Sequence, residues 1–153
     1  MLETIVSVPA TGGIAHVIQL AVAPVFLLTG VGAILNVMAN RLARIVDRAR
    51  MVELKLAGVE GAGTAVYAEL EQRLKNLSRR AKLISHAIAL CVLTAVLVCA
   101  VIITLFLGEF LSYNAASPAA LLFIAALLSF LLALIWLLRE IFLATATLKF
   151  GPG

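Results

Sequence analysis

Three long apolar runs constrain this chain more than any other feature of its sequence. They extend over residues 14–38, 83–107 and 119–138. Each run holds about 20 residues or more, the length that a helix needs to cross a hydrocarbon core of roughly 30 Å. Because backbone N–H and C=O groups find no water inside a bilayer, each run should be helical. We therefore predict an all-α integral membrane protein with three transmembrane helices.

The overall composition excludes the soluble alternatives. Hydrophobic residues make up 63% of the 153 residues and charged residues only 13%, against about 45–50% and about 25% in soluble domains. So few polar side chains cannot cover a soluble globule of this size, which excludes a soluble enzyme, and a chain this apolar is not disordered. Two cysteines are too few for a disulfide scaffold.

The basic residues predict how the chain is oriented. Ten of the twelve Lys and Arg residues lie in segment 39–82, which has a net charge of +5 because it also holds five acidic residues. Loops rich in Lys and Arg stay on the cytoplasmic side of a membrane. We therefore expect residues 1–13 and the loop 108–118 to be external, and residues 39–82 and 139–153 to be cytoplasmic.

The cytoplasmic segment has the pattern of two helices rather than a loop. Apolar residues recur at alternating steps of three and four in two seams, which is a heptad pattern. A glycine-rich turn at residues 58–64 separates them. We predict that the first two transmembrane helices continue into an antiparallel coiled-coil hairpin with arms of about 20 residues, roughly 30 Å long. Two amphipathic helices lying on the membrane surface are the alternative. The seams are Met38, Leu42, Ile45, Ala49, Val52 and Leu56, and Tyr67, Leu70, Leu74, Leu77, Ala81 and Ile84.

Small and polar residues follow the first helix on the side away from its seam. Asparagine side chains in or near lipid are costly unless they find partners. This polar stripe should therefore meet another helix of the same chain, another subunit or water. It consists of Thr29, Gly32, Asn36, Asn40, Arg44, Asp47 and Arg48.

The charged end of the polar stripe has three interpretations. One is anchoring at the membrane edge with local ion pairing, since Asp47 is spaced to pair with Arg44 or Arg50 on one helix. The second is a structural latch across helices or subunits, with Glu140 beside Arg139 as its natural acidic partner; the latch candidates are Arg44, Asp47, Arg139 and Glu140. The third is the lining of a path for an ion or solute.

Motifs for chemistry are missing from the sequence. It has no HExxH or CxxC motif, no phosphate-binding glycine loop and no Ser, His and Asp set on one helix face. We therefore expect no catalytic residues, no metal site, no cofactor and no enzymatic activity. Attraction to anionic lipid accounts for the basic residues, so we expect no nucleic-acid partner.

Two segments carry a family resemblance. The stretch PVFLLTGVGAILNVMANRLARIVDRAR, Pro24 to Arg50, resembles the signature of an uncharacterised bacterial family of three-pass membrane proteins, domain of unknown function 2721. LLREIFLATATL, Leu137 to Leu148, is similar to the end of that family's third span, with its acidic residue at Glu140. The resemblance implies a bacterial membrane location and a three-helix plan, and no activity comes with it. The matching elements of the first stretch are Pro24, the region of Gly30 and Gly32, Asn40-Arg41, Arg44 and Asp47-Arg48.

Two functions compete at this stage. Three helices can hardly enclose a water path, so a polar stripe on one helix favours a homo-oligomeric channel of the inner membrane with the first helix on its axis. Rings of Arg44 and Arg48 would then favour anions unless Asp47 neutralises them. The alternative is a non-conducting scaffold that binds a protein partner at the hairpin. That plan is similar, at the level of the fold alone, to small membrane-protein insertases.

Overall fold

The computed structural model describes residues 10–58 and 64–146, and this part of the chain folds into three helices. They are α1 (Ala10–Gly58), α2 (Thr64–Phe110) and α3 (Ala116–Ala146). All three are long and apolar enough to cross a membrane. This confirms the predicted all-α fold, and the three helices fit a three-pass membrane protein. Of the predicted external segment, turn and cytoplasmic end, residues 1–9, 59–63 and 147–153 lie outside the described residues.

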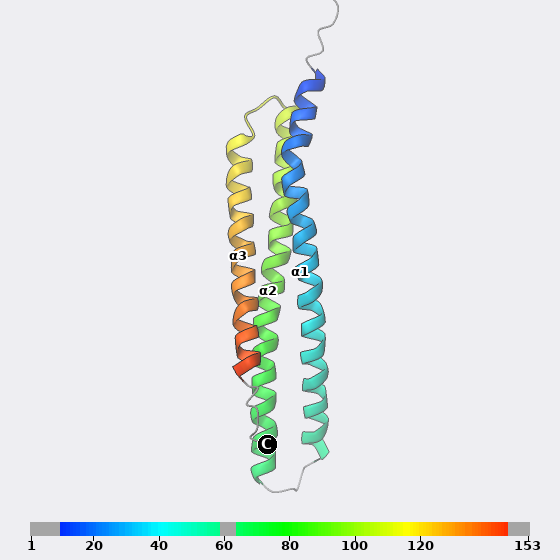
Figure 1. The fold of residues 1–153 in the computed structure, drawn as a ribbon, viewed down its shortest axis with the longest axis vertical. Helices are drawn as coiled ribbons and strands as arrows, with labels where there is room; N and C mark the ends of the chain where they lie inside the picture. Colours follow the sequence, from blue (N-terminus) through cyan, green and yellow to red (C-terminus); the bar gives the residue numbers. More distant parts are fainter. Residues whose placement is uncertain (1–9, 59–63, 147–153) are drawn as a thin grey trace, which may run out of the picture.

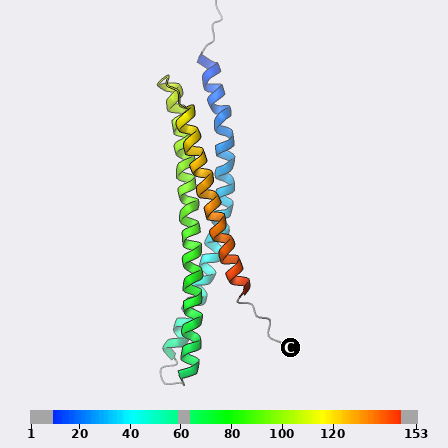
Figure 2. The same cartoon turned by 90° about the vertical axis from the view of Figure 1, so that its left-hand side faces the viewer.

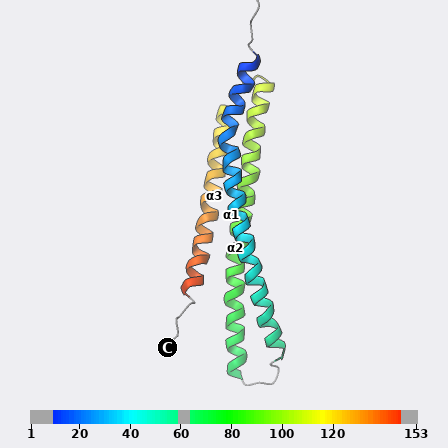
Figure 3. The same ribbon diagram turned by 45° about the vertical axis from the view of Figure 1, so that its right-hand side comes forward.

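The three helices lie side by side, with α2 between the other two (Figure 1). α2 packs along both neighbours, whereas α1 and α3 have few direct contacts. α3 is inclined to α2 (Figure 2). It is also the shortest helix, so α1 and α2 continue past its last turn as a pair of antiparallel arms (Figure 3).

Buried residues on each helix recur every seven positions. Val31, Met38 and Ile45 form this row on α1, and all are less than 5% exposed. On α3 the row consists of alanines, which let the backbone of α3 come close to that of α2. The α2 row alternates steps of three and four, so one face meets α1 and an adjacent face meets α3. The α2 row is Ile84, Ala87, Cys91, Thr94, Val98 and Val101, and the α3 row begins with Ala119, Ala126 and Ala133.

A polar contact joins α2 and α3 within the apolar region. Ser129 Oγ donates a hydrogen bond to the backbone oxygen of Leu90, at 3.0 Å. The hydroxyl of Thr94 donates to the same oxygen, at 2.9 Å. Both side chains are buried. Their hydroxyl groups therefore find acceptors where no water reaches them, as burial requires.

The connection between α2 and α3 is short, and each helix end that it joins is capped. Tyr113 N–H donates to Gly108 O and Ser112 N–H to Glu109 O, while Ser112 has a φ of 54°. This bond pattern around a left-handed residue is a Schellman motif. The side chain of Asn114 then accepts from Ala116 N–H at 3.1 Å, as a helix N-cap does.

The arms turn their seams toward each other but leave a groove. Seam residues such as Val52 and Leu74 are half-buried. Met51 and Leu54, which lie off the seam of the α1 arm, are exposed. A groove of about 410 Å³ runs between the arms. It is lined by Ile45, Val46, Ala49, Arg50, Glu53, Leu74, Leu77, Ser78 and Ala81.

Candidate functional site

Glu140 is the centre of the candidate site. It lies near the end of α3, seven residues after Ala133, and so occupies the next position in the buried alanine row. Because this row packs against α2, the carboxylate is carried into the helix interface and is only 1% exposed. An ionised carboxylate in such a place needs charged partners.

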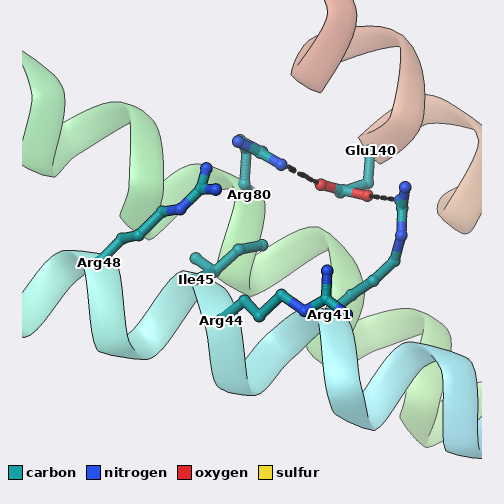
Figure 4. Close-up of a pocket in the computed structure, with 6 residues that line it drawn as sticks. All are labelled: Arg41, Arg44, Ile45, Arg48, Arg80 and Glu140. Carbon is teal, nitrogen blue, oxygen red and sulfur yellow. Dashed lines mark hydrogen bonds and ion pairs between the residues drawn. The ribbon is translucent and has the colours of Figure 1, made fainter.

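Two arginines from different helices supply those partners (Figure 4). Arg41 of α1 donates from Nη1 to Glu140 Oε2 at 2.5 Å. Arg80 of α2 donates from Nη2 and Nε to Glu140 Oε1, at 2.7 Å and 3.1 Å. The carboxylate thus uses both oxygens and joins all three helices, including α1 and α3, which hardly pack against each other.

The two arginines reach Glu140 because they also lie on packed faces. Arg41 comes between the buried residues Met38 and Ile45, three and four residues away, and Arg80 comes four residues before buried Ile84. Helical residues three or four apart share one face. Neither arginine is in the predicted set of site residues, although this spacing is a signal that could have identified both.

A pocket of about 200 Å³ opens beside the three paired side chains. Four arginines, one glutamate and Ile45 line it. Within residues 10–58 and 64–146, no ion pair or hydrogen bond of the Arg44 or Arg48 side chain is found. The charged groups of the pocket are therefore four positive and one negative, an excess of three positive charges. The arginines are Arg41, Arg44, Arg48 and Arg80.

Of the predicted latch residues, only Arg44 and Glu140 lie at the same pocket, and they do not pair with each other. Arg44 lines the pocket of Glu140, but Arg41 and Arg80 make the ion pairs because they lie on the packed faces, whereas Arg44 is exposed. Arg139 instead places its guanidinium carbon 5.7 Å from the centre of the Trp136 ring. In the described part of the chain Asp47 forms no ion pair, neither with Arg44 nor with Arg50.

Five of the seven residues of the polar stripe lie on the outer face of α1, and Arg44 and Arg48 line the Glu140 pocket. All seven residues of the stripe are exposed, so α2 and α3 do not cover them. Asn40 donates a hydrogen bond to Asn36 at 3.3 Å, and Thr29 donates to Val25 O at 3.4 Å. A methyl group added to Gly32 would meet no atom within 4 Å. Arg44 and Arg48 line the Glu140 pocket beside Arg80 of α2, whereas the other five residues of the stripe are exposed on the side away from α2 and α3.

The arrangement suits binding and helix assembly. Glu140, the one buried carboxylate among the described residues, is held by two guanidinium groups. Across the described residues, no three His, Cys, Asp or Glu side chains lie together in a way that could hold a metal ion. What the pocket offers instead is a convergent set of N–H donors with excess positive charge, which is suited to an anion.

Fold and site together define a three-helix membrane protein whose helices are joined by one carboxylate and two arginines. The model of the family described as "Protein of unknown function (DUF2721)" matches residues 21–150. The chain belongs to this family, which confirms the resemblance carried by its Pro24–Arg50 and Leu137–Leu148 segments. No curated protein and no solved structure matches the chain.

Proposed function

We propose that the protein is a homo-oligomeric channel of the bacterial inner membrane, with α1 of each subunit facing a central axis. The exposed polar stripe is the observation that supports this proposal. Thr29, Asn36 and Asn40 lie within or just beyond the first apolar run, yet neither α2 nor α3 covers them. A ring of subunits would give these groups water or a neighbouring helix in place of lipid, where polar side chains are costly.

The charge distribution supports an orientation for the channel. Arg41, Arg80 and Arg139 come from three helices and gather around Glu140 and Trp136 at the end of α3. Eight further Lys and Arg residues follow on the two arms. By the positive-inside tendency, the arms are a cytoplasmic coiled-coil hairpin, the N-terminus is external and the C-terminus is cytoplasmic.

A flux assay in liposomes tests conduction, and native mass spectrometry in gentle detergent counts the subunits. The proposal expects a closed ring of four or more subunits and flux of chloride or potassium down a gradient. Asn40→Leu should reduce the flux because it removes a polar group from the axis. Asn76→Leu is the matched control, because it makes the same change at an exposed position on the α2 arm.

Two outcomes contradict the channel. One is a monomer or dimer, which leaves no room for a central path. The other is the absence of flux under any gradient when the protein is correctly inserted. A flux that Asn40→Leu and Asn76→Leu change equally would show that the stripe does not line the path.

A non-conducting scaffold is the second candidate, and the groove between the arms favours it. The groove is lined both by apolar seam residues and by charged residues, among them Leu74, Leu77, Arg50 and Glu53. A helix of a protein partner would fit such a surface. A co-purifying partner should then be lost with Leu74→Ser and kept with Leu54→Ser, since Leu54 is 71% exposed outside the groove.

Neither proposal gives the protein an enzymatic role. A general acid or base needs a titratable group that is free to exchange a proton with a substrate. Glu140, the buried carboxylate, is held by Arg41 and Arg80. Incubation of the purified protein with substrates of common membrane hydrolases should therefore give no turnover above that of the Glu140→Gln variant.

A further inference from the structure

The pocket beside Glu140 holds more positive charge than the protein neutralises. Glu140 is shared by Arg41 and Arg80, while the Arg44 and Arg48 side chains have no ion pair or hydrogen bond in the part of the chain that the structure describes. Four guanidinium groups lining a pocket of about 200 Å³ repel one another. An anion in the pocket would relieve this repulsion.

The four arginines that line the pocket offer N–H donors to the oxygen atoms of an anion. Arg41 and Arg80 are fixed by Glu140 from opposite sides, and Arg44 and Arg48 reach toward the same space from successive turns of α1 (Figure 4). A guanidinium presents its N–H groups as a planar fork that matches phosphate oxygens. Glu140 is thus a positioning residue that fixes two of the four forks.

The excess charge points to an anion with more than one negative charge. A phosphodiester carries one negative charge, whereas a phosphate monoester carries about 1.5 to 2 at neutral pH. We propose that this pocket binds a phosphate monoester group, and that it does so whether or not the protein conducts ions.

The position of the pocket favours a lipid as the source of this phosphate. The apolar side chain of Val37 lies one turn before Arg41 on the same face of α1 and is 52% exposed. The phosphate groups of a bilayer lie where such an apolar surface ends, and basic pockets between membrane helices bind lipid head groups. An acyl chain would then cover Val37, as a soluble phosphate cannot.

Native mass spectrometry of the protein in neutral detergent tests the proposal with three probes. The probes are phosphatidic acid as the monoester lipid, phosphatidylcholine as the neutral lipid and inorganic phosphate as the soluble anion. The variant is the double change Arg44→Gln and Arg48→Gln, which leaves the Glu140 ion pairs intact. The matched control is Arg50→Gln with Arg79→Gln, which removes the same charge from exposed positions outside the pocket.

Two results support the proposal and identify the source of the phosphate. Phosphatidic acid retained in preference to phosphatidylcholine, with affinity at least tenfold lower in Arg44→Gln/Arg48→Gln and unchanged in the control, indicates a lipid. Inorganic phosphate bound with the same variant pattern, without a preference between the lipids, indicates a soluble ligand.

Other results overturn it. Binding that both double variants weaken equally would reflect general attraction to the basic arms rather than a pocket. If none of the three probes binds, the pocket is not a phosphate site. The unfolding temperature of each variant without ligand shows whether the fold is intact. Should Arg44→Gln/Arg48→Gln unfold, Arg44→Lys/Arg48→Lys keeps the charge without the forks, and affinity equal to that of the wild type would refute the forked geometry.

Discussion

Replacing Glu140 with glutamine should destabilise the three-helix assembly more than any other single change of a charged residue. Glutamine has nearly the shape of glutamate but no charge. Its amide oxygen can accept from one arginine, while its NH2 group would face the N–H donors of the other. Arg41 and Arg80 would then lie close together without the carboxylate that now separates them.

The magnitude follows from the burial of the three groups. Hydrogen bonds to charged groups contribute about 1.5–3 kcal/mol, and Arg80, at 19% exposed, should supply about 2 kcal/mol on this scale. Arg41 is 38% exposed, so water screens its pair and about 1 kcal/mol is expected. The sum of about 3 kcal/mol is at the low end of the 3–5 kcal/mol cost of breaking a buried ion pair.

Urea unfolding in neutral detergent micelles measures this loss. Trp136 is the one tryptophan of the chain and lies one turn before Glu140, stacked on His86 at 5.6 Å between ring centres. Its fluorescence therefore reports on the α2–α3 contact beside the site. The control is Glu69→Gln, which breaks the exposed Arg73–Glu69 pair at 2.7 Å and should cost less than about 0.5 kcal/mol.

A loss below about 0.5 kcal/mol for Glu140→Gln, equal to that of the exposed control, would refute the reasoning. A double-mutant cycle sharpens the test. Glu140 should couple more strongly to Arg80 than to Arg41, since Arg80 is more buried and donates two hydrogen bonds. Equal coupling, or stronger coupling to Arg41, would show that burial does not set the energy.

Five further changes at four positions test the packing and the turn after α2, all by the same unfolding measurement. Ser129→Ala should cost about 0.6 kcal/mol, because it removes the bond to Leu90 O, and no loss would mean that this bond is not formed. Gly108→Ala should destabilise by about 1 kcal/mol or more, since its methyl group would overlap Ala115 Cβ. Gly32→Ala, which meets no atom, should instead stabilise the single subunit by up to about 1 kcal/mol, and equal effects would contradict this contrast. Ser112→Gly should leave stability unchanged or raise it by less than about 1 kcal/mol, whereas Ser112→Val should lower it, because φ is 54°. The reverse order would refute the left-handed turn.

The helices could be predicted from the sequence because the bilayer demands them. Any apolar run of sufficient length must satisfy its backbone internally, so the three runs alone define three helices. Their ends are set by other forces. α1 continues past residue 38, and α2 begins well before residue 83, because the heptad seams provide packing where lipid does not. α2 ends at a Schellman motif built on Ser112 rather than on a glycine.

The sequence predicts the carboxylate of the site but not the two arginines that pair with it. Glu140 stands out in the sequence as an acidic residue at the end of an apolar run. Its partners do not, because eight basic residues lie within ten positions of residue 38 on α1 or residue 83 on α2, and charge alone does not distinguish them. The position of each arginine around its helix, relative to the buried residues, distinguishes them. Arg41 and Arg80 share the faces of buried Met38 and Ile84, whereas Arg44 does not share that of Met38.

The same angular positions show which α1 arginine belongs to the Glu140 pocket and which belongs to the polar stripe. At about 100° per residue, Arg48 projects within about 20° of Arg41 and Arg44 lies about 60° away. Thr29, Asn40 and Asp47 cluster roughly 100–120° from Arg41, on the outer face. Arg48 therefore belongs with the Glu140 pocket, and Asp47 is the charged residue that continues the polar stripe. An axis lined by the stripe would then carry Asp47 with Arg44 at its edge, which weakens the case for a strong preference for anions and assigns the basic charge to the pocket instead.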